Sequence, residues 1–370
     1  MQLTELFLSN YRNYDHLALT FHADLICFIG SNAQGKTNIL ESIFLCTGRS
    51  HRTPRDRELI QWGKEEALVR TKVNKQLGIS EIAIGLFSSE KKKILINQSP
   101  ADRMGELMGH LNSVIFSPED LKLVREGPQE RRRFMDMELS QVKPKYFYHL
   151  QQYNRVLNQR NRLLKEIPYK PSLMNTLPVW DKQLAEAGSY IIMQRQLFCD
   201  SLHTIAGEIH KHITRDSEKL SVEYKPSIAF YKETANQEEI QKNFLKELEH
   251  KHMDDTKRGT TSRGCHRDDI VFQINDKDVR IFGSQGQKRT TVISVKLSEL
   301  EFMVQETGEY PLLLLDDAMS ELDSSRKKMI LKYIDKVQTF VTLTDLDQLP
   351  DLKDKSRQVF QVKSGEVIPI

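Results

Sequence analysis

The segment GSNAQGKT, residues 30–37, constrains the fold more than any other stretch of the chain. It fits the phosphate-loop pattern G-x-x-x-x-G-K-[ST] without mismatch. The apolar run DLICFIG, which ends at Gly30, predicts a buried strand before this loop. The apolar spacing of TNILESIFLCTG predicts a helix that begins at Thr37. In such a loop Gly30 and Gly35 let the backbone wrap phosphates, Lys36 reaches the β- and γ-phosphates and the Thr37 hydroxyl ligates Mg²⁺. The predicted nucleotide-binding residues are Gly30, Ser31, Asn32, Ala33, Gln34, Gly35, Lys36 and Thr37.

A second motif, LLLLDD at residues 312–317, is an apolar strand that ends in two carboxylates. On its own it would be unremarkable, but beside a phosphate loop it predicts a Walker-B strand. Asp316 is then the expected Mg²⁺ ligand, and Asp317 is expected to orient or deprotonate the attacking water. Kinases, GTPases and transport ATPases share both motifs, so they do not select a function. The chain has no Asn-Lys-x-Asp run for guanine, which makes ATP the expected nucleotide.

A second phosphate-binding loop, FGSQGQKRT, runs into a predicted helix at residues 282–290. A helix N-terminus carries unpaired N–H groups and a partial positive charge, both of which favour anions. With the Asp-rich strand and SELD that follow, this loop resembles the signature motif, Walker B and D-loop of ABC-type ATPases. That resemblance implies that Ser284, Gly286 and Gln287 bind the γ-phosphate of nucleotide held by a second subunit, and that the protein forms an ATP-dependent homodimer. The alternative is a flexible loop before a basic helix start.

The pattern along the chain predicts an α/β protein in which both ends of the chain form one nucleotide-binding core around an inserted helical lobe. The resemblance to ABC-type ATPases implies that the core is an ABC-type ATPase head (lobe I) and that the insert is helical lobe II. Residues 1–120 and 262–370 are expected to form lobe I. Between 67 and 97 the sequence has the pattern of antiparallel strands separated by turns, and after 262 a β/α pattern returns with a strand near DIVFQI. Residues 121–261 are expected to form lobe II. Apolar spacings of three and four on both sides of PYKPSLMNTLP predict an antiparallel helical hairpin at about 146–213. Residues 231–260 are expected to be a solvated helix and a loop.

Composition excludes several classes of protein. Lys and Arg total 54 against 51 acidic residues, so net charge predicts neither a nucleic-acid nor a membrane partner, and any such partner must be inferred from local patches. The four cysteines form no C-x-x-C pair, which argues against a disulfide framework or a zinc site. No stretch approaches the ~18 apolar residues of a membrane span. We expect a cytoplasmic protein without a membrane partner.

Several segments together resemble the RecF family of bacterial recombination-mediator ATPases, which are related to SMC and Rad50 heads. They are LFLSNYRNY, FIGSNAQGKTNILESIFLCTGRSHRT, FSPEDLKLVREGPQERRRFMD, HRDDI, FGSQGQKRT and LLLLDDAMSELD. The resemblance implies binding to double-stranded DNA and to single-strand/double-strand gap junctions, and RecR and RecO as partners. It also implies recombinase loading at gaps during repair, replication-fork maintenance and the SOS response. The alternatives are the nucleotide-binding subunit of an ABC transporter, another SMC-like chromosome protein or a P-loop kinase.

Carried over to this sequence, the resemblance gives Lys36, Asp317 and Ser284 catalytic roles, with Ser284 acting on the partner's nucleotide. Ser117 and Thr344 stand where many ABC ATPases have the Q-loop Gln and the switch His. Cys265 stands where the family pattern has Pro. Asp317 is one methylene shorter than the usual Glu, so we expect slow hydrolysis. The resemblance implies a weak, DNA-stimulated ATPase that serves as a clamp switch. The candidate residues for neutralising the phosphates of bound DNA are Arg131, Arg132, Arg133, Arg155, Arg160 and Arg162. The alternative is that these arginines solvate a helix face or pair with nearby glutamates.

Overall fold

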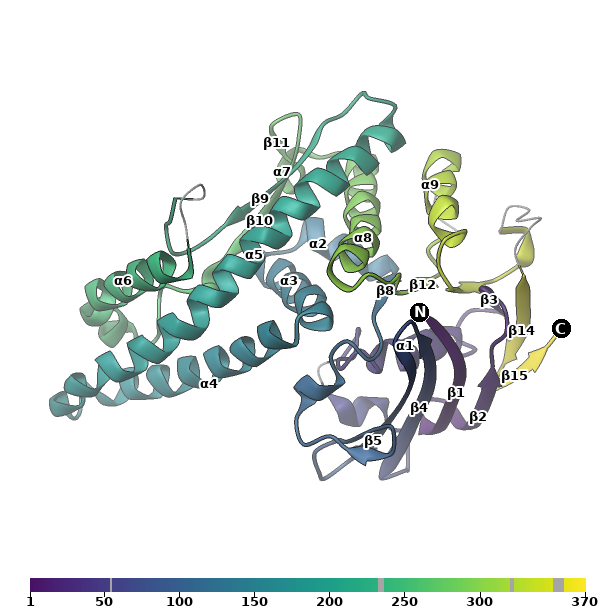
Figure 1. Cartoon of the computed structure of the whole chain (residues 1–370), viewed down its shortest axis with the longest axis horizontal. Coiled ribbons are helices and arrows are strands. Elements are labelled where there is room, and N and C mark those ends of the chain that lie inside the picture. The colour runs from purple at the N-terminus through teal and green to yellow at the C-terminus, as the bar shows by residue number, and fades with distance from the viewer. Residues whose placement is uncertain (54, 232–235, 320–322, 349–355) are drawn as a thin grey trace. The chain divides into compact units, whose positions relative to one another are not determined.

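The structure is a computed structural model that describes residues 1–53, 55–231, 236–319, 323–348 and 356–370 (Figure 1). The chain forms two compact units. Unit 1 contains residues 1–121, 209–216 and 292–370, and unit 2 contains residues 122–208 and 217–291. Two helices, α5 (Leu177–Thr214) and α8 (Gln285–Thr307), contain residues of both units.

The centre of unit 1 is a six-stranded sheet in the order β15-β14-β3-β13-β12-β8. Its strands are β3 (Leu25–Ile29), β8 (Ser113–Phe116), β12 (Leu312–Asp316), β13 (Thr339–Leu343), β14 (Arg357–Lys363) and β15 (Glu366–Pro369). All neighbouring pairs are parallel except β14 with β15. Every residue of β12 and β13 is buried, as expected for parallel strands covered on both faces. Because these strands are parallel, the phosphate loop after β3 and the carboxylates at the end of β12 meet at one sheet edge.

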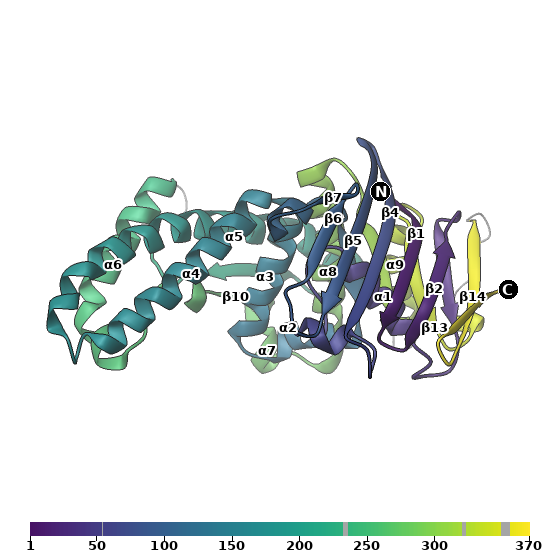
Figure 2. The same cartoon turned by 90° about the horizontal axis from the view of Figure 1, so that it is seen from below.

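A second sheet of unit 1 is antiparallel, in the order β2-β1-β4-β5-β6-β7 (Figure 2). Its strands are β1 (Gln2–Tyr11), β2 (Tyr14–Thr20), β4 (Glu66–Lys75), β5 (Gly78–Phe87), β6 (Lys93–Ile96) and β7 (Ser99–Pro100). The strands predicted between residues 67 and 97 are therefore confirmed. The α-helices wholly within unit 1 are α1 (Lys36–Leu45) and α9 (Ser324–Ile334) among the described residues. Short 3₁₀ turns are η1 (Asp56–Leu59), η2 (Met104–Leu107), η3 (Pro118–Leu121) and η6 (Leu346–Gln348).

Unit 2 is mainly helical. Its helices are α2 (Lys122–Arg125), α3 (Pro128–Val142), α4 (Pro144–Glu166), α6 (Gln237–Arg258) and α7 (Val279–Phe282), with η4 (Pro171–Thr176) and η5 (Cys265–Arg267). The predicted hairpin is confirmed, because α4 and α5 run side by side in Figure 1 and are joined by the Pro-containing η4 segment. Arg160 of α4 is hydrogen-bonded at 2.7 Å to Asp181 of α5. The predicted solvated helix is α6, but it buries Ile240, Phe244 and Leu248.

The structure corrects the prediction for DIVFQI. This segment is β10 (Asp269–Ile274), and it pairs with β9 (Leu220–Lys225) and β11 (Lys277–Asp278) in a separate three-stranded sheet of unit 2. Its partner β9 comes from the inserted lobe, so residues 262–291 stay with unit 2 and do not return to the ATPase core at 262. The first boundary, at Leu121, agrees with the predicted limit of lobe I. Among the described residues, none of the helices has the length and apolar character needed to cross a membrane.

Candidate nucleotide-binding site

The loop at 30–37 connects β3 with α1 and depends on two glycines. A Cβ atom at Gly30 would lie 2.3 Å from the Val362 carbonyl oxygen, and one at Gly35 would lie 2.8 Å from the Tyr14 hydroxyl. Gly35 is the N-cap of α1 with a φ of 110°, a conformation that a side chain disfavours. Only glycine fits both positions. Because α1 begins at Lys36, the loop lies directly at a helix N-terminus, where phosphate binds.

The tip of this loop is held by two segments far away in sequence. The Gln34 side-chain oxygen accepts a hydrogen bond of 2.6 Å from the Ser364 N–H, in the turn between β14 and β15. The Gln34 carbonyl accepts one of 3.2 Å from the Asn13 amide, and the Asn13 side-chain oxygen accepts one of 2.7 Å from Asn38. The loop conformation is thus supported from outside the motif, which the motif alone could not reveal.

The side chain of Lys36 folds back over the first residues of the same loop. Its Nζ donates to the carbonyl oxygens of Gly30 and of Ser31, the latter at 2.8 Å. Burial lowers the pKa of Lys36, while the neighbouring carboxylates of Asp317 and Asp316 act in the opposite direction. The ammonium group therefore lies between the phosphate loop and the two acidic residues, where a phosphate group would gain a charge-assisted partner.

Asp316 is the centre of a buried polar cluster at the end of β12. Its carboxylate accepts hydrogen bonds from the hydroxyls of Thr37 at 2.7 Å and of Thr342 at 3.0 Å. Arg52 forms an ion pair with it at 3.0 Å. Thr37 and Asp316, which were both predicted to hold Mg²⁺, are far apart in sequence, and the fold brings their side chains into direct contact. Arg52 is a site residue that the sequence reasoning missed, although GRSHRT directly after the first helix was a signal for it.

Asp317 follows with a φ of 52°, the left-handed region that Asp tolerates better than most residues. Its N–H donates to the Thr342 hydroxyl at 2.9 Å, so one threonine contacts both acidic residues. A cavity of about 340 Å³ lies over this edge of the sheet. It is lined by Asn32, Ala33, Gln34, Gly35, Lys36, Thr37, Asn38, Arg52, Pro118, Asp316, Asp317 and Thr342. The volume falls within the range of small-ligand sites.

Ser117 and Thr344 occupy the positions at which many ABC ATPases have the Q-loop Gln and the switch His. The Ser117 hydroxyl lies 3.0 Å from His51 Nε2, and the Ser117 N–H donates to the Asp120 carboxylate at 2.7 Å. Burial raises the pKa of Asp120 to about 6. Thr344 is exposed after the end of β13. Ser117 and Thr344 therefore lack the amide and imidazole groups that many ABC ATPases have at these two positions.

The second predicted phosphate-binding loop, residues 282–290, lies in unit 2, whereas the first lies in unit 1. Ser284 and Gln287 cap the start of α8 reciprocally: the Gln287 N–H donates to the Ser284 hydroxyl at 3.2 Å, and the Ser284 N–H donates to the Gln287 side chain at 2.9 Å. The Gln287 amide also donates to Glu218 at 2.9 Å, and the Gly286 carbonyl accepts from Thr290. Ser284 is exposed. Residues 320–322 of the predicted D-loop lie outside the described residues.

Comparison with known proteins decides the family. The model described as the RecF/RecN/SMC N terminal domain matches residues 2–367. The "DNA replication and repair protein RecF" of Alkaliphilus oremlandii is 48% identical over 368 residues, covering 99% of this chain and 100% of the relative. The protein of the same name from Ruminiclostridium cellulolyticum is 44% identical over 369 residues, covering 99% of both chains. The chain belongs to the RecF family.

Solved structures agree with this assignment. The structure described as the recombination mediator protein RecF with ATP in the RecFOR pathway has a TM-score of 0.92 at 37% identity, covering 100% of this chain and 97% of that one. The Smc head of Pyrococcus furiosus, at 14% identity with a TM-score of 0.56, covers 100% of this chain and 95% of its own and shares the fold alone. The expected α/β, ABC-type, SMC-like ATPase fold is confirmed, as is the resemblance to RecF.

Two of the candidate DNA-binding arginines of this RecF-family chain have structural roles. Arg160 is fully buried and pairs with Asp181 at 2.7 Å and with Asp255 at 2.9 Å. Arg131 is 4% exposed and pairs with Asp269 at 2.6 Å. Buried guanidinium groups with carboxylate partners cannot reach a phosphate without leaving uncompensated charges behind. Both residues are therefore removed from the candidate DNA contacts.

The other four arginines differ in exposure. Arg132 is half-buried and donates to the Asp268 carbonyl at 2.8 Å, and Arg133 is also half-buried. Arg155 and Arg162, on α4, are exposed. Arg155 donates to the Gln152 side chain at 2.8 Å. The arginines at 155 and 162 therefore stay the strongest of the predicted DNA contacts. The spacing of the basic residues along α4 did not distinguish Arg160 from its exposed neighbours.

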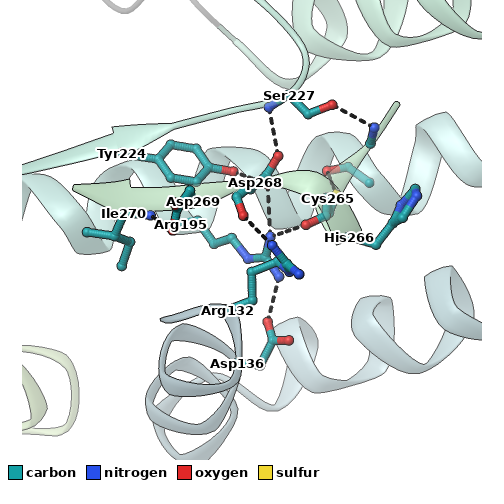
Figure 3. Close-up of polar contacts among 12 residues, drawn as sticks. Arg132, Asp136, Arg195, Tyr224, Ser227, Cys265, His266, Asp268, Asp269 and Ile270 are labelled. Atoms are coloured by element: carbon teal, nitrogen blue, oxygen red, sulfur yellow. Dashed lines mark hydrogen bonds and ion pairs between the residues drawn. The ribbon is translucent and has the colours of Figure 1, made fainter. Parts of the chain in front are cut away.

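The segment GCHRDDI at residues 264–270 forms a buried polar network (Figure 3). Asp268 accepts hydrogen bonds from Arg195 and from the Ser227 N–H, both at 2.8 Å, and from the Tyr224 hydroxyl. Arg195 also donates to Asp136 at 2.8 Å and to the Cys265 carbonyl at 2.7 Å. The network links α3, α5, β9 and the η5 segment that precedes β10. Breaking one partner of such a buried pair costs roughly 3–5 kcal/mol, which gives this part of the motif a structural role.

His266 lies at the edge of this network, and its burial should make the free energy of unfolding depend on pH. Its Nδ1 lies 2.8 Å from the Tyr153 hydroxyl and its Nε2 lies 2.9 Å from the Thr261 carbonyl. Burial lowers the pKa of His266 from 6.5 to about 4. As the pH falls below 6.5, the unfolded chain takes up this proton and the folded chain does not. The free energy of unfolding should therefore fall by about 2 kcal/mol between pH 7 and pH 5 on account of this residue.

Urea unfolding at both pH values, for the wild type and for His266→Gln, measures the effect. The glutamine keeps hydrogen-bonding groups but does not titrate, so the loss on acidification should be smaller in the variant by that amount. Equal losses in both proteins would contradict the assignment of a neutral, buried His266. The Nε2–H tautomer follows from the carbonyl partner, since a carbonyl oxygen only accepts.

Proposed function

We propose that this chain is an ATP-dependent, dimerising DNA-binding protein that acts in recombinational repair and replication-fork maintenance. One observation carries the proposal. A single cavity of unit 1 gathers the lysine, the threonine–aspartate pair and the second aspartate that a Mg²⁺-nucleotide requires, within a RecF-family chain. The close relatives are named DNA replication and repair proteins, and the solved relative is described as bound to ATP.

The nucleotide would be bound by Lys36 and by the loop backbone, and Mg²⁺ by Thr37 and Asp316. The donor set fits the ion, because a carboxylate and a hydroxyl at 2.7 Å offer hard oxygen ligands and Mg²⁺ takes its remaining ligands from water and phosphates. The ion would neutralise charge on the β- and γ-phosphates. Arg52, which pairs with the same carboxylate, adds a positive group to the cavity wall.

Dimerisation would use Ser284 on the nucleotide of the second subunit. Its hydroxyl oxygen accepts the Gln287 N–H, which leaves the hydroxyl proton available as a donor. Gly286 and Gln287 lie in the first turn of α8, whose N-terminus favours an anion. A γ-phosphate presented by another subunit would gain these donors, and two-fold pairing would use both sites equally.

Hydrolysis should be slow, and DNA should stimulate it. Ser117 is engaged with His51 and Asp120, and Thr344 replaces a histidine, so the groups that position water in other ABC ATPases are altered. Asp317 is the residue closest to a general base, with a shorter side chain than Glu. Slow turnover would suit a clamp whose ATP-bound lifetime sets its residence on DNA.

The DNA partner would be duplex and single-strand/double-strand gap junctions. RecO and RecR are the proposed protein partners, with recombinase loading at gaps as the outcome. The support is the similarity to a solved protein described as a recombination mediator of the RecFOR pathway. Among the described residues we find no base-reading motif, so binding should be sequence-tolerant and strongly dependent on salt.

Sedimentation of the purified chain tests the proposal. With ADP the chain should sediment as a monomer, and with ATP or a non-hydrolysable analogue it should sediment as a dimer that binds duplex DNA. A transport ATPase subunit or a P-loop kinase would not bind duplex DNA in an ATP-dependent way. A chain that stays monomeric with ATP and duplex DNA together would contradict the proposed function.

The variant Asp317→Asn tests the hydrolytic step. Asn tolerates the left-handed backbone at this position, so the fold should persist, but the amide cannot accept a proton from water. Phosphate release at saturating ATP should fall about 10- to 100-fold, while ATP-dependent dimers form as in the wild type. Wild-type turnover in this variant would remove Asp317 from catalysis without affecting its place in the cavity.

A further inference from the structure

The outer face of helix α4 has an unusual composition. Its exposed residues follow the spacing i, i+3, i+4, i+7, i+8 and i+11, which places them on one side of a helix. They are Gln151, Asn154, Arg155, Asn158, Gln159 and Arg162, and all six are exposed. We call this set the amide–arginine face. The opposite side of α4 is buried through Leu150, Tyr153 and Val156, so the six residues are not needed for the core of unit 2.

The amide–arginine face lies in a stretch without carboxylates. The sequence has no Asp or Glu between Glu138 and Glu166, although 51 of its 370 residues, about one in seven, are acidic. Helix α6 in the same unit mixes its lysines with glutamates such as Glu239 and Glu249. Neither Arg155 nor Arg162 forms an ion pair within the described residues. A solvated helix face with no other role would be expected to carry charges of both signs.

We propose that the amide–arginine face contacts the phosphate backbone of duplex DNA. This inference rests on the proposed function and adds the location of the contact. Phosphate oxygens only accept hydrogen bonds, and every side chain of the face can donate, with two of the six carrying a full positive charge. The face covers 11 residue steps, or roughly 17 Å, which matches the rise of about five base pairs along one strand. The absence of carboxylates removes the repulsion that an ordinary charged helix would bring.

The double variant Arg155→Gln/Arg162→Gln tests the inference on the full-length chain with ATP. The measurement is the affinity for a duplex oligonucleotide as a function of salt, by fluorescence anisotropy. Two lost phosphate contacts should reduce the slope of log affinity against log salt by about 1.8. If the affinity at 1 M salt is unchanged, the same slope predicts roughly a 60-fold loss at 0.1 M. ATP-dependent dimerisation and thermal unfolding should not change, because both side chains are exposed.

Two further variants make the test specific to this face. Lys242→Gln/Lys246→Gln removes the same charge from exposed positions of α6 in the same unit, and it should leave the slope as in the wild type. Asn158→Lys adds a cation at the centre of the face and should increase the slope by about 0.9. A gain of binding cannot arise from misfolding, so this variant separates contact from stability.

The outcomes are distinguishable. If the wild type binds no duplex with ATP, the proposed function fails and this inference fails with it. If the wild type binds but the double variant keeps its affinity and slope, only the inference fails. Loss of binding to a partner protein, with duplex binding intact, would assign the face to that protein and overturn the contact with DNA. A slope that falls in both double variants equally would show a general charge effect and would also overturn it.

Discussion

Lys36→Met should abolish ATP binding and, with it, ATP-dependent dimerisation. The Lys36 ammonium donates to the Gly30 and Ser31 carbonyls and lies near Asp316 and Asp317. Methionine has a similar length but no charge, so two charge-assisted hydrogen bonds to phosphate are lost. At about 1.5–3 kcal/mol for each bond, the affinity for ATP should fall roughly 10²- to 10⁴-fold, measured by titration calorimetry.

The fold of this variant should persist. Burial already opposes the charge on Lys36, as its lowered pKa shows, and Arg52 stays paired with Asp316. The thermal midpoint of the chain without nucleotide should therefore be equal or higher than in the wild type. Lys64→Met is the matched control, because Lys64 is an exposed lysine of the same unit outside the cavity. ATP affinity within a factor of ten of the wild type in Lys36→Met would contradict the role of the phosphate loop.

The core of unit 1 could be predicted because its signals are local. The run before Gly30 and the run before Asp316 are apolar at every position, which indicates buried parallel strands. Parallel strands end at the same sheet edge, so the pairing of Thr37 with Asp316 follows from the motifs. The helical hairpin was predictable for the same kind of reason, since apolar spacing and prolines lie within the segments concerned.

Long-range contacts explain what the sequence could not predict. The segment at β10 has an ordinary strand pattern, and only its pairing with β9 places it in unit 2. The support of Gln34 by Ser364 joins residues at opposite ends of the chain. Arg160 interrupts an apolar stripe, which can mean an exposed or a buried charge. Its partners Asp181 and Asp255 decide the matter, and they lie in two other helices.

Ser284→Arg should leave ATP binding by the monomer intact and prevent dimerisation. The residues that line the cavity at the phosphate loop all belong to unit 1 and do not include Ser284, so we expect the nucleotide site of one chain not to need its own signature loop. Arginine is too large for a position that must approach the γ-phosphate of a second subunit, and it removes the hydroxyl donor. Sedimentation with a non-hydrolysable ATP analogue should show only monomers, whereas calorimetry should give the wild-type affinity at low protein concentration.

A loss of dimers could also arise from fraying of α8, because Ser284 caps that helix and cap loss costs about 1 kcal/mol. Ser284→Asp removes this ambiguity. Aspartate is as good a cap as serine, but it would bring a negative charge against the partner's γ-phosphate. It should therefore keep the wild-type thermal midpoint and still fail to dimerise. Ser284→Asn, a neutral cap, should retain more dimer than aspartate. Wild-type dimerisation by Ser284→Asp would contradict a phosphate contact at this residue, since no other expected contact depends on the sign of its charge.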